Sequence, residues 1–291
     1  MEKYNAHQDL VRDLNFYPLG VKEPIILSKI DIKNYNEFCY IYPKKIFSKL
    51  EVKKIKKYFE IILAKAIESG WNSYEIHNWH KHCEGIYEIV TENRIVDIVQ
   101  DLLGESVIMR ASQFFVKLPG DKKQVSWHQD ASFWPLSKSR SVSVWLAVDE
   151  VNIDNGAMQF IPSSHLESQI PYFDTKIDEN NVLNQTVINA EKYGGKPVSV
   201  DLKPGEISLH SDWTLHRSGM NLSKNRRAGL VIRFVSNDVK AFKGWNVHSV
   251  ICRGKDPSGH WANNIKPTGE TIPQKIDSGI TEIPIYAQGT N

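Results

Sequence analysis

The spacing of hydrophobic residues changes from a helical to a strand period near residue 104. Before this point, apolar residues recur at three- and four-residue intervals between Ser48 and Gly70, which predicts an amphipathic helix with these two residues at its ends. The segment Thr91 to Gly104 shows the same spacing, and we expect Thr91 as its N-cap and Gly104 as its C-cap.

After Gly104, hydrophobic and polar residues alternate, as in β-strands. Further strand candidates are SVIMRASQFFVKLPG, GAMQFIPSSH, KPVSVDL, GEISLHS and RAGLVIRFV, separated by turn-forming DNG, YGGK and KPG. Many short strands after a helical segment predict an antiparallel double sheet with helices packed outside it. The clearest strand is SVSVWLAVDEV, which places Val142, Val144, Leu146 and Val148 on one side and Ser141, Ser143, Trp145 and Ala147 on the other.

This pattern predicts one domain over residues 1–291. It has a helical N-terminal third (1–104), a β core of about 105–236 and a segment of about 237–291 whose Gly, Pro and Trp content suggests a covering flap. The polar stretch from about Glu167 to Gly194 has weak periodicity, which predicts an insertion loop near a site.

Composition and charge narrow the class of partner. The 36 basic and 34 acidic side chains give a net charge of +2, which disfavours nucleic-acid or membrane-surface binding. The three cysteines, Cys39, Cys83 and Cys252, match no zinc or disulfide spacing. MEKYNAHQDLVRDL lacks the apolar run of a signal peptide, YAQGTN is no targeting tripeptide, and no later stretch is long enough to cross a membrane. We therefore expect a cytoplasmic protein.

The stretch SWHQDASFW contains the first candidate metal ligands. Because side chains on a strand alternate, His128 and Asp130 are expected on the same face. With a histidine from another strand they would form the two-histidine, one-carboxylate face of non-haem Fe(II) oxygenases. The motif alone is a weak signal, since HSD at His210 to Asp212 repeats it.

The region after His216 adds a second chemical feature. In LHRSGMNLSKNRRAGLVIRF, Arg227 stands eleven residues after His216 and begins a strand candidate. An arginine fork suits the distal carboxylate of a metal-chelating 2-oxo acid, and Ser218 adds a hydroxyl group nearby. The alternative is that Arg226 and Arg227 are a solvated pair on a turn.

The order of three motifs resembles a known family. VSWHQDASFWPL, SVSVWLAVDEVNIDNGAMQFIPSSH and LHRSGMNLSKNRRAGLVIRF resemble the phytanoyl-CoA dioxygenase family of Fe(II)/2-oxoglutarate enzymes. RGKDPSGHW resembles an element of its small-molecule branch, which includes ectoine hydroxylase and the carrier-protein halogenases. The resemblance covers roughly residues 91–261 and implies a double-stranded β-helix (jelly roll, cupin-like) with flanking helices.

The resemblance also implies site residues. His128, Asp130 and His216 match the catalytic iron ligands, whereas Arg227 and Ser218 match residues that bind the distal carboxylate of 2-oxoglutarate. In the halogenating relatives the carboxylate position holds a small residue, so Asp130 favours oxygenation. The remaining expected pocket residues are Trp145, Gln113 and Lys117 for the cosubstrate, and Phe133, Trp134, Arg110 and His80 for the substrate.

Two further clusters compete with this assignment. If His210 and Asp212 were ligands, no arginine followed by a strand would stand eleven residues after the distal histidine, so we expect them in the turn before His216. HNWHKHCE, with His77 to Glu84, resembles a metal cluster, but its spacing fits no standard zinc site. We expect pocket or surface roles for it.

The expected activity is oxidation of a C–H bond of a small molecule with Fe(II), 2-oxoglutarate and O2. Hydroxylation is the default, and desaturation and oxidative cyclisation use the same ligands. Arg110, Lys117 and Arg140 favour an anionic substrate in specialised or amino-acid-derived metabolism, although CoA- or carrier-bound substrates stay open. The alternatives are a non-catalytic jelly-roll binding protein and a cupin metalloenzyme that does not use 2-oxoglutarate. The sequence does not predict the oligomeric state.

Overall fold

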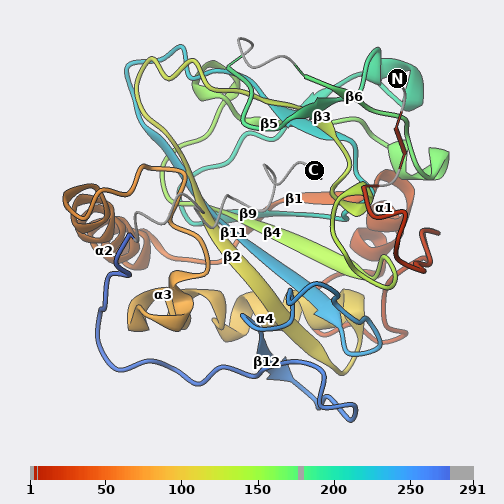
Figure 1. The fold of residues 1–291 in the computed structure, drawn as a ribbon, viewed down its shortest axis with the longest axis horizontal. Helices are drawn as coiled ribbons and strands as arrows, with labels where there is room; N and C mark the ends of the chain where they lie inside the picture. Colours follow the sequence, from red (N-terminus) through yellow and green to blue (C-terminus); the bar gives the residue numbers. More distant parts are fainter. Residues whose placement is uncertain (1–2, 5, 176–179, 276–291) are drawn as a thin grey trace.

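Two antiparallel sheets face one another in the computed structural model, which describes residues 3–4, 6–175 and 180–275 (Figure 1). The large sheet has the order β1-β9-β4-β11-β2-β12 and the small sheet the order β3-β10-β5-β8. Strands of the large sheet are β1 (Tyr40–Lys45), β2 (Val107–Lys117), β4 (Ser141–Ala147), β9 (Glu206–His210), β11 (Arg227–Ser236) and β12 (Val250–Arg253). Those of the small sheet are β3 (Val125–His128), β5 (Met158–Phe160), β8 (Val198–Ser199) and β10 (His216–Ser218).

Helices cover the face of the large sheet that points away from the small sheet (Figure 1). The α-helices are α1 (Lys29–Phe38), α2 (Lys49–Glu68), α3 (Glu84–Val90) and α4 (Asn93–Leu103). Short 3-10 helices are η1 (Trp79–Lys81), η2 (Asp130–Ser132), η3 (Ile153–Asn155), η4 (Ser164–Glu167) and η6 (Ala190–Tyr193). The predicted double sheet with outer helices is confirmed. Within the described residues, no helix has both the length and the apolar character needed to cross a membrane.

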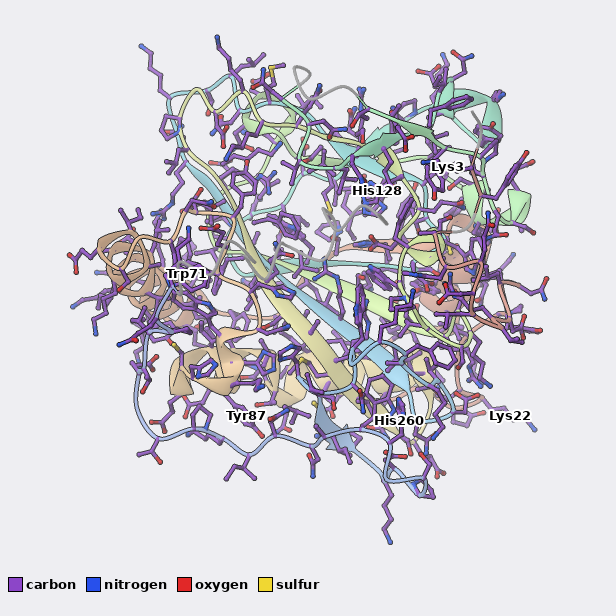
Figure 2. All side chains as sticks on the ribbon, in the orientation of Figure 1. Lys3, Lys22, Trp71, Tyr87, His128 and His260 are labelled. Atoms are coloured by element: carbon purple, nitrogen blue, oxygen red, sulfur yellow. The ribbon has the colours of Figure 1, made fainter. Side chains whose placement is uncertain are left out.

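The alternation of β4 decides what each face of the large sheet contacts. Val142, Val144 and Leu146 are buried in the hydrophobic cluster shared with the helices. Trp145 and Ala147 lie on the opposite face, in a cluster with residues of the small sheet. Figure 2 marks His128 on this inner side, whereas Tyr87 lies among the helices. The inner face of β4 thus presents apolar side chains to the space between the sheets, into which His128 also points.

The first predicted helix begins and ends almost as expected. The Ser48 side chain accepts a hydrogen bond from the backbone of Glu51, and Glu51 bonds back to the backbone of Ser48, which is a capping box. The helix ends at Glu68 with Ser69 as its C-cap, and Gly70 follows in the left-handed region at φ +81°.

The expected N-cap of α4 was wrong. Thr91 is the C-cap of α3, and its hydroxyl group donates a hydrogen bond to the carbonyl group of Tyr87. Glu92 caps α4 instead, through its side chain and the backbone of Arg94. Two helices therefore meet where one was predicted, while the C-cap at Gly104 is confirmed.

The helical N-terminal third also contains a strand that the pattern did not predict. β1 pairs with β9 at the edge of the large sheet, with Tyr40 opposite His210. Its sequence, YIYPKK, includes Pro43 and two lysines, which suit an edge strand because an edge position tolerates a missing N–H group.

The segment expected as a flap follows two courses. Its first part packs beside the sheet opening, where Leu136 pairs with Ala241, and β12 extends the edge of β2. The chain then runs back along the helical side, where Trp71 donates a hydrogen bond to the carbonyl group of Pro273 (Figure 1). Residues 276–291 of the expected flap lie outside the described residues.

The polar stretch after Glu167 is not without structure. It forms a separate two-stranded sheet from β6 (Phe173–Asp174) and β7 (Gln185–Thr186), which lies beside β3. The backbone N–H group of Val187 donates to the carbonyl group of Trp127. Residues 176–179 of this stretch lie outside the described residues.

Candidate metal centre and active site

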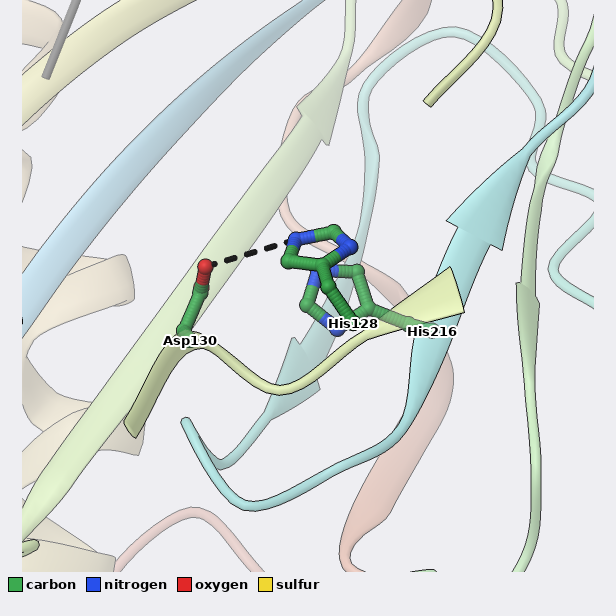
Figure 3. A group of neighbouring side chains, drawn as sticks. All are labelled: His128, Asp130 and His216. Carbon is green, nitrogen blue, oxygen red and sulfur yellow. Dashed lines mark ion pairs between the residues drawn. The ribbon is translucent and has the colours of Figure 1, made fainter. Parts of the chain in front are cut away.

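Three candidate metal ligands meet on the small sheet. In the pairing of β3 with β10, His128 lies opposite His216, and Asp130 follows at the start of η2 (Figure 3). One ligand atom from each residue lies within 4.8 Å of the other two, and all three residues are buried. No other group of three or more candidate ligands occurs among the described residues.

The sequence pattern predicted Asp130 on the same strand as His128, but Asp130 lies beyond the end of that strand. β3 ends at His128, and the chain turns at Gln129, whose side chain is fixed by backbone groups on the outside of the site. The Gln129 amide donates to the carbonyl groups of Ser168 and Trp213, and its oxygen accepts from the N–H group of Ile170. This turn brings the carboxylate of Asp130 beside the ring of His128.

Backbone carbonyl groups set the tautomer of both histidines. Nδ1 of His128 lies 2.9 Å from the carbonyl oxygen of Ser126, and Nδ1 of His216 lies 2.8 Å from that of Thr214. A carbonyl oxygen only accepts hydrogen bonds, so each Nδ1 carries the proton and each neutral ring presents the lone pair of Nε2. Nε2 of His128 lies 3.5 Å from Oδ1 of Asp130, so two electron-rich atoms face one another. A cation between them satisfies this arrangement.

The electrostatics of the three side chains fit the same conclusion. Burial alone would raise the pKa of Asp130, but the neighbouring rings of His128 and His216 and the charge of Arg233 hold it well below its ordinary value. Burial lowers the pKa of His216 well below its ordinary range, and His128 lowers it further. The site therefore favours an ionised carboxylate and a neutral His216 ring, the forms that bind metals.

A cavity of about 50 Å³ opens from the three ligands toward β11 and β4. This volume holds a few water molecules or part of a small ligand. Its walls are mostly apolar, and its polar groups are gathered at the metal ligands and near Arg227. The cavity is lined by Phe115, Val125, His128, Asp130, Trp145, Met158, Val182, Leu183, His210, His216, Arg217, Ser218, Arg227, Val231 and Arg233.

Arg227 lies in this cavity with its charge only partly satisfied. Nη2 donates to the carbonyl oxygen of Gly156 at 2.8 Å, while Nε has no hydrogen-bond partner among the described residues. The guanidinium lies 5.4 Å from the ring centre of Trp145. Burial lowers its pKa to about 10, which leaves it cationic at neutral pH. The alternative of a solvated arginine pair is wrong, because Arg227 is buried and Arg226 is ion-paired with Asp149.

Lys117 is a second buried basic side chain at this end. Its ammonium group donates to the carbonyl groups of Lys123, Ser218 and Gly219. Burial and the neighbouring Arg227 lower its pKa to about 6. With a pKa of about 6, Lys117 is mostly uncharged at neutral pH, so the charge that suits this end of the cavity to a carboxylate is that of Arg227.

The structure brings part of the predicted cosubstrate set together. Ser218, Trp145 and Arg227 line the cavity. Lys117 lies behind its wall, and Gln113 is buried with its amide donating to the carbonyl group of Tyr74.

The residues expected to contact substrate have different positions. Trp134 is buried beneath the guanidinium of Arg110, and Phe133 is partly buried against Tyr172. His80 lies on the helical side of β2, where its two ring nitrogens contact the hydroxyl group of Ser112 and the carbonyl group of His248. The structure gives His80 a supporting place outside the cavity wall.

Arg233 and His210 are among the cavity residues that sequence reasoning missed. Arg233 lies six residues after Arg227 on β11, so strand alternation puts both on the inner face. His210 was expected in a turn, yet its ring lies 5.0 Å from that of His216 and lines the cavity. The period-two rule applied from Arg227 and along GEISLHS would have found both.

Asp212 does belong to the turn before His216. Its buried carboxylate accepts hydrogen bonds from the hydroxyl groups of Ser139 and Ser211, and its carbonyl group accepts from the N–H group of Ala131. Burial raises the pKa of Asp212. This residue therefore ties the turn to η2, which carries Asp130.

Comparison with known proteins identifies relatives of the chain. The family model described as "Phytanoyl-CoA dioxygenase (PhyH)" matches residues 35–229. A probable alpha-ketoglutarate-dependent hypophosphite dioxygenase of Stutzerimonas stutzeri is 29% identical over 56% of this chain and 57% of the relative. A methylphosphonate hydroxylase of Gimesia maris is 22% identical over 72% of this chain and 80% of the relative. The match thus spans little more than half of the first relative.

Solved structures share the fold. The non-heme monooxygenase ThoJ in its apo form has a TM-score of 0.68 at 21% identity, covering 82% of this chain and 88% of its own. EctD from S. alaskensis with 2-oxoglutarate and 5-hydroxyectoine has a TM-score of 0.67 at 19% identity, covering 94% and 97%. Because the family model matches more than half of the residues, the chain belongs to the phytanoyl-CoA dioxygenase family.

Proposed function

We propose that this chain is an Fe(II)- and 2-oxoglutarate-dependent dioxygenase that hydroxylates a C–H bond of a small molecule. One observation carries the proposal. Two histidines with Nε2 facing inward and one carboxylate, with ligand atoms within 4.8 Å of one another, share a cavity with Arg227, whose Nε atom has no partner among the described residues. The first group suits Fe(II), and the second suits the distal carboxylate of 2-oxoglutarate.

Some side chains of the site would bind the metal ion, and others exclude water from the reacting groups. When bound, Fe(II) and 2-oxoglutarate supply the oxidation: one atom of O2 ends in succinate, CO2 is released, and the other atom converts R–H to R–OH. His128, Asp130 and His216 would hold the metal ion, and three protein ligands would leave it free to bind the cosubstrate. Trp145 and Val231 are buried cavity walls that exclude water from the reacting groups.

The relatives support a small-molecule substrate. Two are named for hypophosphite and methylphosphonate, and a structure with a TM-score of 0.60 at 21% identity is the carbocyclase SnoK from nogalamycin biosynthesis. Asp130 supplies the carboxylate that favours oxygenation over halogenation. We place the chain in the biosynthesis of specialised or amino-acid-derived metabolites, with hydroxylation ahead of desaturation or cyclisation.

The test is anaerobic addition of Fe(II) and 2-oxoglutarate to the purified chain, followed by absorption spectroscopy. We expect the metal-to-ligand charge-transfer band of an Fe(II)–2-oxoglutarate chelate in the wild type and its loss in Asp130→Ala. Admission of O2 with a substrate should then release succinate. Metal binding without the band would favour a cupin metalloenzyme that does not use 2-oxoglutarate. Failure to bind either component would favour a non-catalytic binding protein.

A further inference from the structure

Two arginines stack on one tryptophan beside the metal ligands. The guanidinium carbon of Arg110, on β2, lies 3.9 Å from the ring centre of Trp134, and that of Arg233, on β11, lies 5.5 Å from it. Trp134 is held close to the metal centre because its backbone N–H group donates to the carbonyl group of Asp130. Arg233 itself lines the cavity that contains the three ligands.

Arg110 is buried, and its guanidinium lacks hydrogen-bond acceptors in the part of the chain that the structure describes. Its exposed fraction is 1%, and neither Nε nor Nη2 has a hydrogen-bond partner among the described residues. Leaving buried donors of a charged group unsatisfied is costly, so native structures rarely do so without water or a ligand. Burial and Arg233 lower its pKa to about 9, which leaves it cationic at neutral pH.

The carboxylates near Arg110 already have other partners. Asp130 belongs to the metal triad, and Asp212 accepts hydrogen bonds from Ser139 and Ser211. Both raise the pKa of Arg110 through their charges, but neither makes a hydrogen bond to it among the described contacts. The donors of Arg110 are therefore available to an anion that is not part of the protein.

The surroundings of Arg110 offer access as well as charge. Trp245 also lies near its guanidinium, at 5.4 Å from the ring centre, and is only partly buried. Phe133, packed in the same cluster as Trp134, is partly buried too. The aromatic residues around the arginine pair therefore reach from the buried metal centre toward the surface.

We propose that Arg110 and Arg233 bind the anionic head group of the substrate, a small oxyanion of the carboxylate or phosphonate class, beside the metal ligands. This proposal rests on the proposed dioxygenase function and adds the substrate class to it. The anion satisfies the buried donors of Arg110 and places the substrate at the opposite end of the cavity from Arg227. Two arginine sites thus separate two anions, one for the cosubstrate and one for the substrate.

The test measures binding rather than turnover. The full chain is loaded with Ni(II) and saturating 2-oxoglutarate, so that Arg227 is occupied, and titrated calorimetrically with methylphosphonate, acetate and the neutral acetamide. We expect both anions to bind and acetamide not to bind. In Arg110→Gln the dissociation constants for the anions should rise by about 10- to 100-fold, the effect of losing charge-assisted hydrogen bonds. Arg140→Gln is the matched control. Arg140 was expected near an anionic substrate, but it pairs with Asp238 and does not line the cavity, so this variant should bind anions as the wild type does.

The outcomes separate this proposal from the proposed function. Absence of the Fe(II)–2-oxoglutarate band in the wild type refutes the dioxygenase function. A normal band with equal anion binding in the wild type and Arg110→Gln refutes only the anion site, as does acetamide binding as tightly as acetate. If Arg110→Gln does not fold, Arg110→Lys keeps the charge and removes the fork, and its anion affinity must fall.

Discussion

Single residues at this site are oriented by backbone carbonyl groups on their far side. Ser126 and Thr214 fix Nδ1 of the two histidines, and Gly156 fixes one nitrogen of Arg227. In each case the bonded atom points away from the ligand, and the remaining atom faces the cavity. Because carbonyl groups carry no formal charge, they set direction without neutralising the side chain. The positive charge of Arg227 thus stays available to a bound carboxylate.

Replacing Arg227 by glutamine tests whether its positive charge binds the carboxylate of 2-oxoglutarate. Arg227→Gln removes charge-assisted hydrogen bonds worth about 1.5–3 kcal/mol each, so the dissociation constant for 2-oxoglutarate should rise by about 100-fold. Titration of the anaerobic Fe(II) complex, followed by the charge-transfer band, measures this. Arg226→Gln is the neighbouring control: it breaks the ion pair with Asp149, and we expect a loss of about 1 kcal/mol in unfolding free energy with unchanged 2-oxoglutarate affinity. Equal effects of the two substitutions would contradict the assignment.

Among the elements, β11 organises the cavity. It pairs with β2 on one side and β4 on the other, and its inner face carries Arg227, Gly229, Val231 and Arg233 in alternation. Gly229 leaves room for Trp145 opposite the strand. A Cβ atom at Gly229 would come within 2.0 Å of the Trp145 ring, so no larger residue fits without moving this cavity wall.

Gly229→Ala should therefore damage the site through Trp145. The displaced ring would narrow the cavity next to Arg227, and we expect at least about a tenfold loss of 2-oxoglutarate affinity, together with a change in tryptophan fluorescence, at a stability cost of about 1–3 kcal/mol. Gly195→Ala is the control, because its Cβ would make an ordinary contact of 3.5 Å with Pro162. Wild-type affinity and fluorescence in Gly229→Ala would show that Trp145 does not depend on this space.

Local sequence patterns predicted an element correctly where a single preference, such as strand alternation, determines the structure. They failed where two preferences compete for the same residue. The alternation of β4 gave the inner position of Trp145 because only packing decides it. Thr91 satisfies the preference for an N-cap, yet the helix before it extends far enough to use that residue first. The strand parity that His128 and Asp130 share in sequence does not hold either, because the fixed side chain of Gln129 turns the chain between them.

The site residues show the same limit. His216 and Arg227 could be predicted from their spacing and from the family resemblance. Arg233 could have been predicted from alternation along the strand that carries Arg227, but it was not. The stacking of Arg110 on Trp134 joins positions on different elements. No spacing within one strand encodes such a contact, which depends on how β2 and η2 meet in space.

At the scale of the whole molecule, the metal centre links the short elements of the small sheet to one another. The large sheet and the helices share the largest hydrophobic cluster, whereas β3, β5, β8 and β10 are only two to four residues long. His128 and Asp130 belong to β3 and η2, and His216 belongs to β10. A metal that binds all three joins these short elements more firmly than their few backbone hydrogen bonds do.

Removal of the metal should thus loosen the two halves unequally. A metal present at 100 times its dissociation constant adds about 2.7 kcal/mol to the unfolding free energy, since it binds only the folded chain. Hydrogen exchange followed by mass spectrometry, with Ni(II) or with a chelator, should show faster exchange in β3 and β10 after chelation and little change in α4. Asp130→Ala should exchange in these strands at the chelated rate under both conditions. A uniform change over α4 and the small sheet would instead mean that the metal stabilises the fold as one cooperative unit.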